Sequence, residues 1–151
     1  IIDAGRMAPS AMNRQPWHFI VVTDKDRIEQ LSKGIAGAAQ KFFDLLHGVN
    51  ILKSADVIFH GAAVVILISA PDDNHWSAID TGACIQNMML AARSLGLDTC
   101  PIGLARHVEK TKLLSTLNVP KGHRVQLAII VGYGAEKGKL HKRKKNNVQY
   151  A

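Results

Sequence analysis

The sequence lacks the features that would place it in a membrane or around a metal ion. None of its apolar runs approaches the roughly 18 residues that a transmembrane helix needs. Its two cysteines, Cys84 and Cys100, stand in apolar sequence without a CxxC spacing, so we predict neither a disulfide framework nor a zinc site. The seven histidines are scattered and form no HExxH pair. We therefore expect a protein of a reducing compartment, the cytoplasm, that binds no metal.

A glycine-rich loop that could cradle a nucleotide phosphate is also missing. Residues 132–138 read G-Y-G-A-E-K-G after an apolar segment, but the glycine spacing is one residue too long for a dinucleotide fingerprint. A basic segment follows them, where the fingerprint requires a helix. Residues 134–139 likewise miss the P-loop spacing, and Leu140 stands where a magnesium-binding serine or threonine would be. Both motifs are therefore excluded.

Acidic residues are absent from one basic segment, which carries most of the net charge of +7. Residues 137–145 contain six basic side chains and no acid, which leaves only +1 for the rest of the chain. Such a cluster could bind nucleic acid through phosphates. Aromatic residues make up only 5% of the chain, however, and none interleaves the cluster, because Tyr150 lies beyond it. A nucleic-acid-binding module is therefore a less favoured alternative, since stacking platforms are missing.

The remaining sequence predicts one domain, residues 1–151, in which helices and strands alternate, ending in a basic tail at residues 137–151. Residues 1–8 are typical of the end of a helix, because Pro9 disfavours helical backbone before it. Strands are predicted at 18–22, 63–69 and 124–132 from their β-branched and apolar residues. Helices are predicted in pieces from Lys25, capped by Asp24, towards His47, and at 77–97 and 108–117. The helix at 77–97 is apolar on almost every side, so the core or a partner subunit should bury it.

One segment offers unusual polar chemistry: residues 9–17, P-S-A-M-N-R-Q-P-W, which we call the two-proline loop. Two prolines hold an extended backbone that presents a hydroxyl and two carboxamides. Carboxamides both donate and accept, which suits the acceptor, donor, acceptor edge of a flavin ring. An ordinary polar loop in which Trp17 fills the core explains the same residues, and on chemistry alone it is the simpler interpretation.

Three segments of the sequence carry a family resemblance. The first is residues 3–22, with A-G-R-M-A-P-S-A-M-N-R-Q-P-W-H-F-I-V-V, which is the most specific. The second is residues 80–103, with D-T-G-A-C-I-Q-N-M-M-L-A-A-R-S-L-G-L-D-T-C-P-I-G, and the third is V-G-Y-G at 131–134 followed by Lys142 and Arg143. Together these segments resemble the nitroreductase family of flavoenzymes. The resemblance implies an α+β fold, layered as in α/β proteins, with a central, mostly antiparallel sheet flanked by helices, and a homodimer with shared FMN sites.

The resemblance also implies which residues bind FMN. Residues of the two-proline loop would contact a flavin held largely by the other subunit: Pro9, Ser10, Ala11, Asn13 and Gln15. The turn after the predicted helix at 77–97 would line the flavin near N5 through Pro101, Ile102, Gly103 and Leu104. Lys142 and Arg143 would hold the FMN phosphate, which a guanidinium grips well. Lys144 and Lys145 are expected to be solvated charges.

The implied activity is that of an FMN-dependent oxidoreductase. NADH or NADPH would deliver hydride to flavin N5, and a small acceptor such as a nitroaromatic compound or a quinone would then take the electrons in a ping-pong reaction. No catalytic side chain is predicted. The family's usual arginine-rich, serine-containing N-terminal segment has no counterpart here, because Ile1 falls downstream of it. We expect that the natural chain begins earlier; the alternative is weakened FMN binding, which leaves a non-catalytic flavin-binding relative open.

Overall fold

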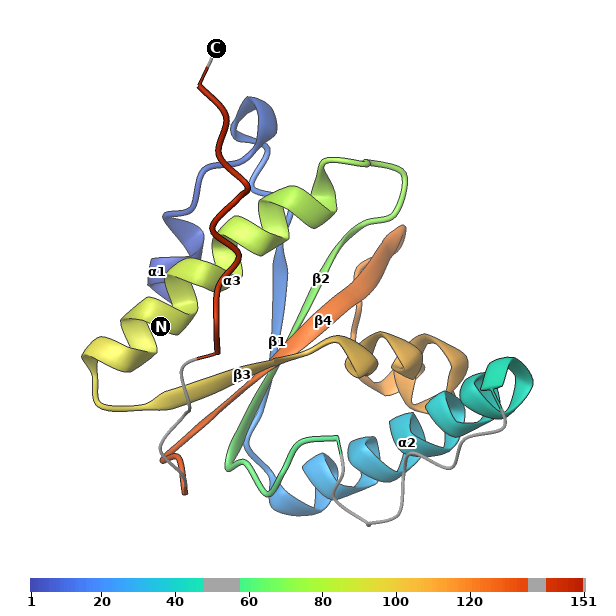
Figure 1. Ribbon diagram of the computed structural model, residues 1–151. Helices are drawn as coiled ribbons and strands as arrows, with labels where there is room; N and C mark the ends of the chain where they lie inside the picture. The colour runs from blue at the N-terminus through green and yellow to red at the C-terminus, as the bar shows by residue number, and fades with distance from the viewer. Residues whose placement is uncertain (48–57, 136–140, 151) are drawn as a thin grey trace.

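The structure is a computed structural model that describes residues 1–47, 58–135 and 141–150. An antiparallel sheet of four strands, in the order β1-β2-β4-β3, lies between two layers of helices (Figure 1). The strands are β1 (His18–Val22), β2 (Val64–Pro71), β3 (Asp98–Ile102) and β4 (His123–Gly132). One face is covered by α1 (Ile2–Arg6) and α3 (Ser77–Ser94), the other by α2 (Lys25–His47) and the 3-10 segments η2 (Gly103–Lys110) and η3 (Lys112–Thr116). The expected α+β layering and antiparallel sheet are confirmed.

The central position of strands β2 and β4 explains why their sequences do not alternate regularly between apolar and polar residues. Six consecutive residues of β2 are buried, from Val65 to Ala70. Val65 pairs with Ile130 of β4, while Val22 of β1 pairs with Val65 from the other side. Helices cover both faces, so the side chains from Val64 to Ile68 alternate between two apolar clusters, and this part of the strand needs no polar residue on either face.

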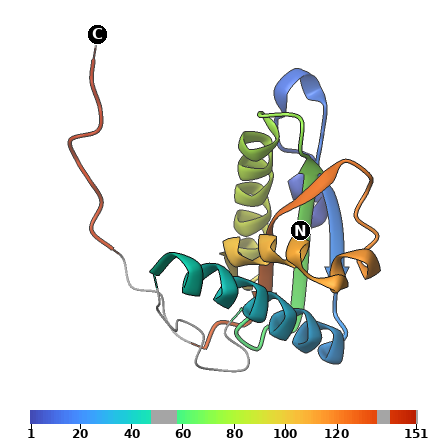
Figure 2. The ribbon, with the colours of Figure 1, turned by 90° about the vertical axis from the view of Figure 1, so that its right-hand side faces the viewer.

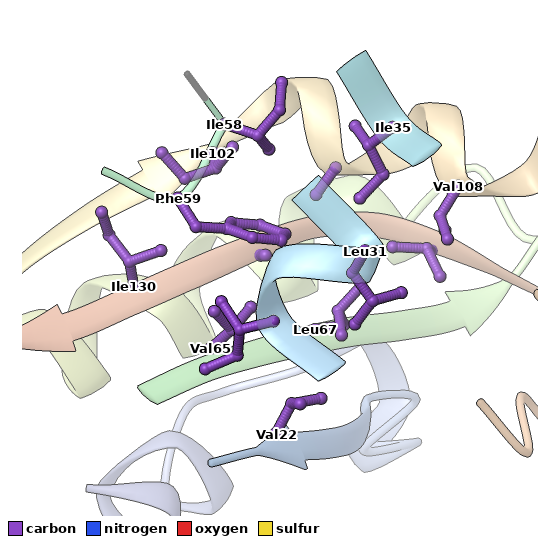
Figure 3. Close-up of a cluster of buried hydrophobic side chains, with 14 of the residues drawn as sticks. Val22, Leu31, Ile35, Ile58, Phe59, Val65, Leu67, Ile102, Val108 and Ile130 are labelled. Carbon is purple, nitrogen blue, oxygen red and sulfur yellow. The ribbon is translucent and has the colours of Figure 1, made fainter. Parts of the chain in front are cut away.

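The first apolar cluster lies between α2, η2 and the sheet. Figure 3 shows Leu31 and Ile35 of α2 grouped with Phe59, Val65 and Leu67, all of which are almost completely inaccessible to solvent. The helix begins as predicted, because Asp24 Oδ1 accepts the N–H of Arg27 at 2.8 Å. The expectation of several helical pieces is wrong, since α2 is one continuous helix of 23 residues.

The second apolar cluster joins α1 and α3 to the opposite face of the sheet. α3 contributes Cys84, Ile85 and Met88 to it, and the two-proline loop contributes Trp17. α1 ends at Arg6, shortly before Pro9, as the sequence predicted. None of the helices in the described residues is long and apolar enough to cross a membrane.

Two segments differ from the sequence prediction. Residues 98–102 form strand β3, which the sequence analysis treated as a turn; this strand pairs only with β4, and such an edge position tolerates Pro101. Cys100 on this strand is exposed rather than enclosed by apolar residues. The predicted helix at 108–117 is wrong, because Thr111 has extended backbone and its hydroxyl accepts the N–H of Leu113, which separates η2 from η3.

Candidate functional site

The two-proline loop has an unusual backbone conformation. Met12, Asn13 and Gln15 all have left-handed φ angles, of 54°, 54° and 47°. Residues other than glycine rarely adopt this region, and each such residue persists only where the surroundings determine it. The middle of the loop forms one turn of 3-10 helix, η1 (Ala11–Asn13). The loop is therefore a defined structure and not a simple extended connection.

Hydrogen bonds within the loop fix the side chains that were proposed to bind a ligand. The Ser10 hydroxyl accepts the N–H of Gln15 at 2.9 Å, and the Ser10 carbonyl accepts the N–H of Asn13 at 2.9 Å. The Gln15 amide donates from Nε2 to Asn13 Oδ1 at 3.1 Å. This pairing uses one group from each carboxamide and leaves Asn13 Nδ2 to donate and Gln15 Oε1 to accept. Both side chains are exposed, so the donor and the acceptor are available to a ligand.

Helix α3 holds the N-terminal segment at two points. Asp80 Oδ1, in the first turn of α3, accepts the N–H of Ala11 at 3.0 Å. Further along the helix, Asn87 Nδ2 donates to the Ala4 carbonyl at 3.2 Å. The simpler interpretation of the loop is correct for Trp17, which is 9% exposed in the second apolar cluster. The loop therefore has a buried anchor and an exposed polar tip.

The turn proposed to lie near flavin N5 is divided between core and surface. Ile102 is 8% exposed and belongs to the first apolar cluster, as Figure 3 shows, so only its backbone is free to meet a ligand. Leu104 packs against the same cluster. Pro101 and Gly103 are exposed, and no heavy atom lies within 4 Å of the place where a Cβ of Gly103 would be. Gly103 thus leaves open space beside the first turn of η2, where backbone N–H groups lack helical partners.

Lys142 and Arg143 lie in the C-terminal segment that the structure describes, residues 141–150. Both are exposed on the basic tail, and Figure 2 shows this segment standing away from the body of the molecule. Arg143 Nη1 donates to the carbonyl of His141 at 3.1 Å. Among the residues that the structure describes, no hydrogen bond joins the tail, the two-proline loop and the turn at 101–103. A single chain therefore does not assemble the three predicted groups into one site.

Two histidines lie beside the two-proline loop. A pocket of about 400 Å³ is lined by the loop, the turn after β2 and the start of β4. His18 and His123 both line it, with ring centroids 6.5 Å apart and the rings nearly perpendicular. Burial, and then the neighbouring His18, lower the pKa of His123 below its ordinary value of 6.5. A larger pocket of about 850 Å³, lined by residues from Thr111 to His123, includes none of the predicted site residues.

Asp80 is the site residue that the sequence analysis missed. It is 4% exposed, although charged residues are rarely buried unless they have partners. The signal was an acidic residue in the first turn of an otherwise apolar helix, inside the second matching segment. Within the described ranges, no group of three histidine, cysteine, aspartate or glutamate side chains could hold a metal ion.

Comparison with known proteins identifies the family to which the chain is similar. The model of the nitroreductase family matches residues 1–133. A protein of Staphylococcus epidermidis named as an NAD(P)H nitroreductase is 27% identical over 163 residues, which cover 89% of this chain and 74% of that protein. A protein of Archaeoglobus fulgidus named as an NADH dehydrogenase/NAD(P)H nitroreductase is 31% identical over 134 residues, or 88% of this chain and 70% of that one.

Solved structures give the same result. The crystal structure of a nitroreductase with bound FMN from Bacteroides fragilis superimposes with a TM-score of 0.84 and 28% sequence identity. The match covers 99% of this chain and 83% of that chain. The family match and the fold lead to the same conclusion: this chain belongs to the nitroreductase family.

Proposed function

We propose that this oxidoreductase of the nitroreductase family binds FMN and transfers electrons from NADH or NADPH to a small organic acceptor, such as a nitroaromatic compound or a quinone. The observation that carries the proposal is the paired carboxamides of Asn13 and Gln15. They present one donor and one acceptor from a loop that is internally hydrogen-bonded and anchored to α3. The similarity to an FMN-bound nitroreductase supports the choice of FMN as the ligand.

The residues present fit a flavin in three respects. The tip of the two-proline loop offers a donor and an acceptor for the polar edge of the ring. Gly103 leaves room for a planar ligand to approach the backbone. The basic tail contains Lys142 and Arg143, which can neutralise a phosphate. These groups lie apart in one chain, so we propose that two subunits supply them to each site.

The outer face of α3 supports a homodimer. Its inner face is buried, whereas Ile79 and Leu90 on the opposite face are 62% and 61% exposed in the single chain. Gln86 and Arg93, both exposed, continue the same stripe of this helix. Exposed apolar residues along a helix are typical of protein interfaces, and stable dimers bury roughly 2,000 Å² or more.

The protein's own residues would act by binding and orientation. Asn13 and Gln15 would fix the polar edge of the ring, the backbone at Gly103 would approach its reactive edge, and Arg143 would hold the phosphate. The chemistry that FMN supplies when bound is the uptake of hydride from a nicotinamide and its delivery to an acceptor in a second half-reaction. No side-chain nucleophile is required.

The experiment that tests this function begins with the absorption spectrum of the purified protein, before and after FMN is added. We expect a bound flavin that NADH or NADPH bleaches and that a nitroaromatic compound or a quinone restores. If FMN binds but neither NADH nor NADPH reduces it, the protein is instead a flavin-binding relative without turnover. If the protein is a dimer and still binds no FMN, the proposal is wrong.

Ile79→Lys tests the shared site. It should turn a dimer into a monomer in light scattering and weaken FMN binding at the same time. Gln30→Lys, a substitution on the exposed surface of α2, is the matched control and should change neither property. A wild-type protein that is monomeric at micromolar concentration would contradict the shared site.

A further inference from the structure

Asp80 is a buried carboxylate whose bonding is incomplete. One oxygen, Oδ1, accepts the N–H of Ala11 at 3.0 Å across 69 residues of sequence. The other oxygen, Oδ2, is buried and has no hydrogen-bond partner in the described structure. The hydroxyls of Ser77 and Thr81, on either side of Asp80 along α3, are also buried without partners. Asp80, Ser77 and Thr81 are 4%, 2% and 1% exposed.

This arrangement is a poor means of stabilising a core. Burying a polar atom without a partner is unfavourable, and apolar side chains of similar size often replace buried charges without loss of stability. The position of Asp80 in the first turn of an 18-residue helix partly compensates, because the positive end of the helix dipole favours a carboxylate. The single described hydrogen bond of the Asp80 carboxylate goes to the two-proline loop.

That hydrogen bond holds the loop directly before its first two left-handed residues. Ala11 precedes Met12 and Asn13, both in the left-handed region, and the Asn13 side chain is paired with Gln15. Ser10 before it is extended, with φ of −144° and ψ of 153°. The N–H of Ala11 is thus used by Asp80, so this atom does not face a ligand. Fixing Ala11 fixes the point from which the turn of η1 begins.

We infer that Asp80 is a positioning residue: its carboxylate holds the backbone of Ala11 so that the Asn13 and Gln15 carboxamides face the flavin in one arrangement. The inference rests on the proposed function for the identity of the ligand. It extends that function to a residue of α3 that touches the loop and not the flavin. Without Asp80, the loop tip should sample several conformations, and part of the binding free energy would be spent on ordering it.

The bond can be removed from either side. Asp80→Ala deletes the acceptor, and Asp80→Asn keeps an oxygen that can accept the same N–H. Ala11→Pro deletes the donor, and it suits the site because Ser10 is already extended and proline is tolerated at the first position of a helix. Glu109→Ala is the matched control, since Glu109 Oε1 accepts the N–H of Val125 at 2.8 Å, a backbone bond between other elements.

Two measurements are made on the dimeric protein: the Kd for FMN, and hydrogen exchange of the amides of Ala11 and Asn13 in the FMN-free form. Asp80→Ala and Ala11→Pro should each raise the Kd about tenfold, and the double variant should raise it no further. Asp80→Ala should also speed exchange at Asn13, whose own partner, Ser10, is unchanged. Asp80→Asn should stay within about threefold of the wild type, and Glu109→Ala should lower the Tm without changing the Kd.

The inference fails if Asp80→Ala leaves both the Kd and the exchange at Asn13 unchanged. It also fails if Asp80→Asn is as damaging as Asp80→Ala, or if the Kd changes only in proportion to the Tm in all variants, Glu109→Ala included. Should Asp80→Ala not fold, Ala11→Pro and Asp80→Asn still decide the question. A wild type that binds no FMN would overturn the proposed function alone, because the exchange measurements test the anchoring of the loop independently.

Discussion

Gly5 of α1 lies so close to Met88 of α3 that a Cβ on Gly5 would be 2.8 Å from Met88 Cγ. The same Cβ would be 3.0 Å from Sγ of Cys84. Met88 and Cys84 are completely buried, so neither can move aside without disturbing the second apolar cluster. This close approach brings α1, and the two-proline loop that follows it, onto α3.

Gly5→Ala should therefore destabilise the protein. Overpacking a core costs about 1 to 3 kcal/mol, offset by up to about 1 kcal/mol because alanine favours a helix over glycine. Gly37→Ala is the control: it lies in α2, and no heavy atom lies within 4 Å of the new Cβ. Thermal unfolding should show a lower Tm for Gly5→Ala and an equal or higher Tm for Gly37→Ala. Equal Tm values would mean that Met88 adapts at no cost.

The strands and helices that the sequence predicted well are those whose own residues favour them. Strand β1 has the predicted bounds because His18–Val22 is rich in β-branched and aromatic residues. Strand β3 was missed because Asp98–Ile102 contains a proline and polar residues; it is a strand because β4 offers an edge to pair with. Such non-local pairing has no signature in the segment itself.

In the candidate site, too, the sequence of a segment indicates some features, and only the folded chain shows the others. The motif identified the residues of the two-proline loop, but not their arrangement. The pairing of Asn13 with Gln15 depends on left-handed backbone at both positions, and only the folded chain shows it. Asp80 was not identified because its partner, Ala11, lies 69 residues away. Ile102 was assigned to the ligand although its side chain fills the core.

Asn13→Ala should weaken FMN binding with little effect on folding. The side chain is exposed, and its Oδ1 is bonded only to Gln15 among the described residues. Loss of one neutral hydrogen bond costs about 0.5 to 1.5 kcal/mol, and the freed Gln15 would add to the loss of affinity. Gln30→Ala removes a similarly exposed carboxamide of α2 as the control. A large fall in Tm with unchanged FMN affinity would show that Asn13 serves only the loop's structure.

Cys100 should react with a thiol reagent in the native protein, while Cys84 should not. Cys100 is exposed on β3, whereas Cys84 is buried and burial raises its pKa to about 11. The reactive thiolate of Cys84 is therefore both scarce and inaccessible at neutral pH. Mass spectrometry should find one modification per chain in the folded protein and two after denaturation. Modification of Cys84 in the folded protein would indicate that α1 opens from α3.

Stability should fall as the pH is lowered from about 7 to 5. His123 has a pKa below its ordinary value of 6.5 because of burial and the nearby His18, and His107 has a lowered pKa because of burial and then Lys110 and Arg106. As the pH falls, these histidines therefore take up protons in the unfolded chain before they do so in the folded protein. Their contribution to the free energy of unfolding is complete above the ordinary pKa of 6.5, and it is lost as the pH falls through the lower pKa of the folded protein.

His123→Gln should make the Tm depend less on pH in that range, and His141→Gln, on the exposed tail, should not. The comparison requires that the flavin be absent, since ligand binding also shifts the Tm. If His123→Gln leaves the dependence of the Tm on pH unchanged, other groups cause the acid sensitivity.

Loss of Arg143 from the basic tail should selectively weaken FMN binding. In the single chain its guanidinium is hydrogen-bonded only to the carbonyl of His141 among the described residues, so it is available to a phosphate in the dimer. A hydrogen bond to a charged group contributes about 1.5 to 3 kcal/mol, so Arg143→Ala should raise the Kd for FMN roughly ten- to a hundredfold. Riboflavin lacks the phosphate, and its Kd should hardly change. Neutralising Lys144 and Lys145 together should matter less, because exposed charges are screened. Equal losses in both variants would mean that the tail attracts FMN by diffuse charge, without a fixed partner for Arg143.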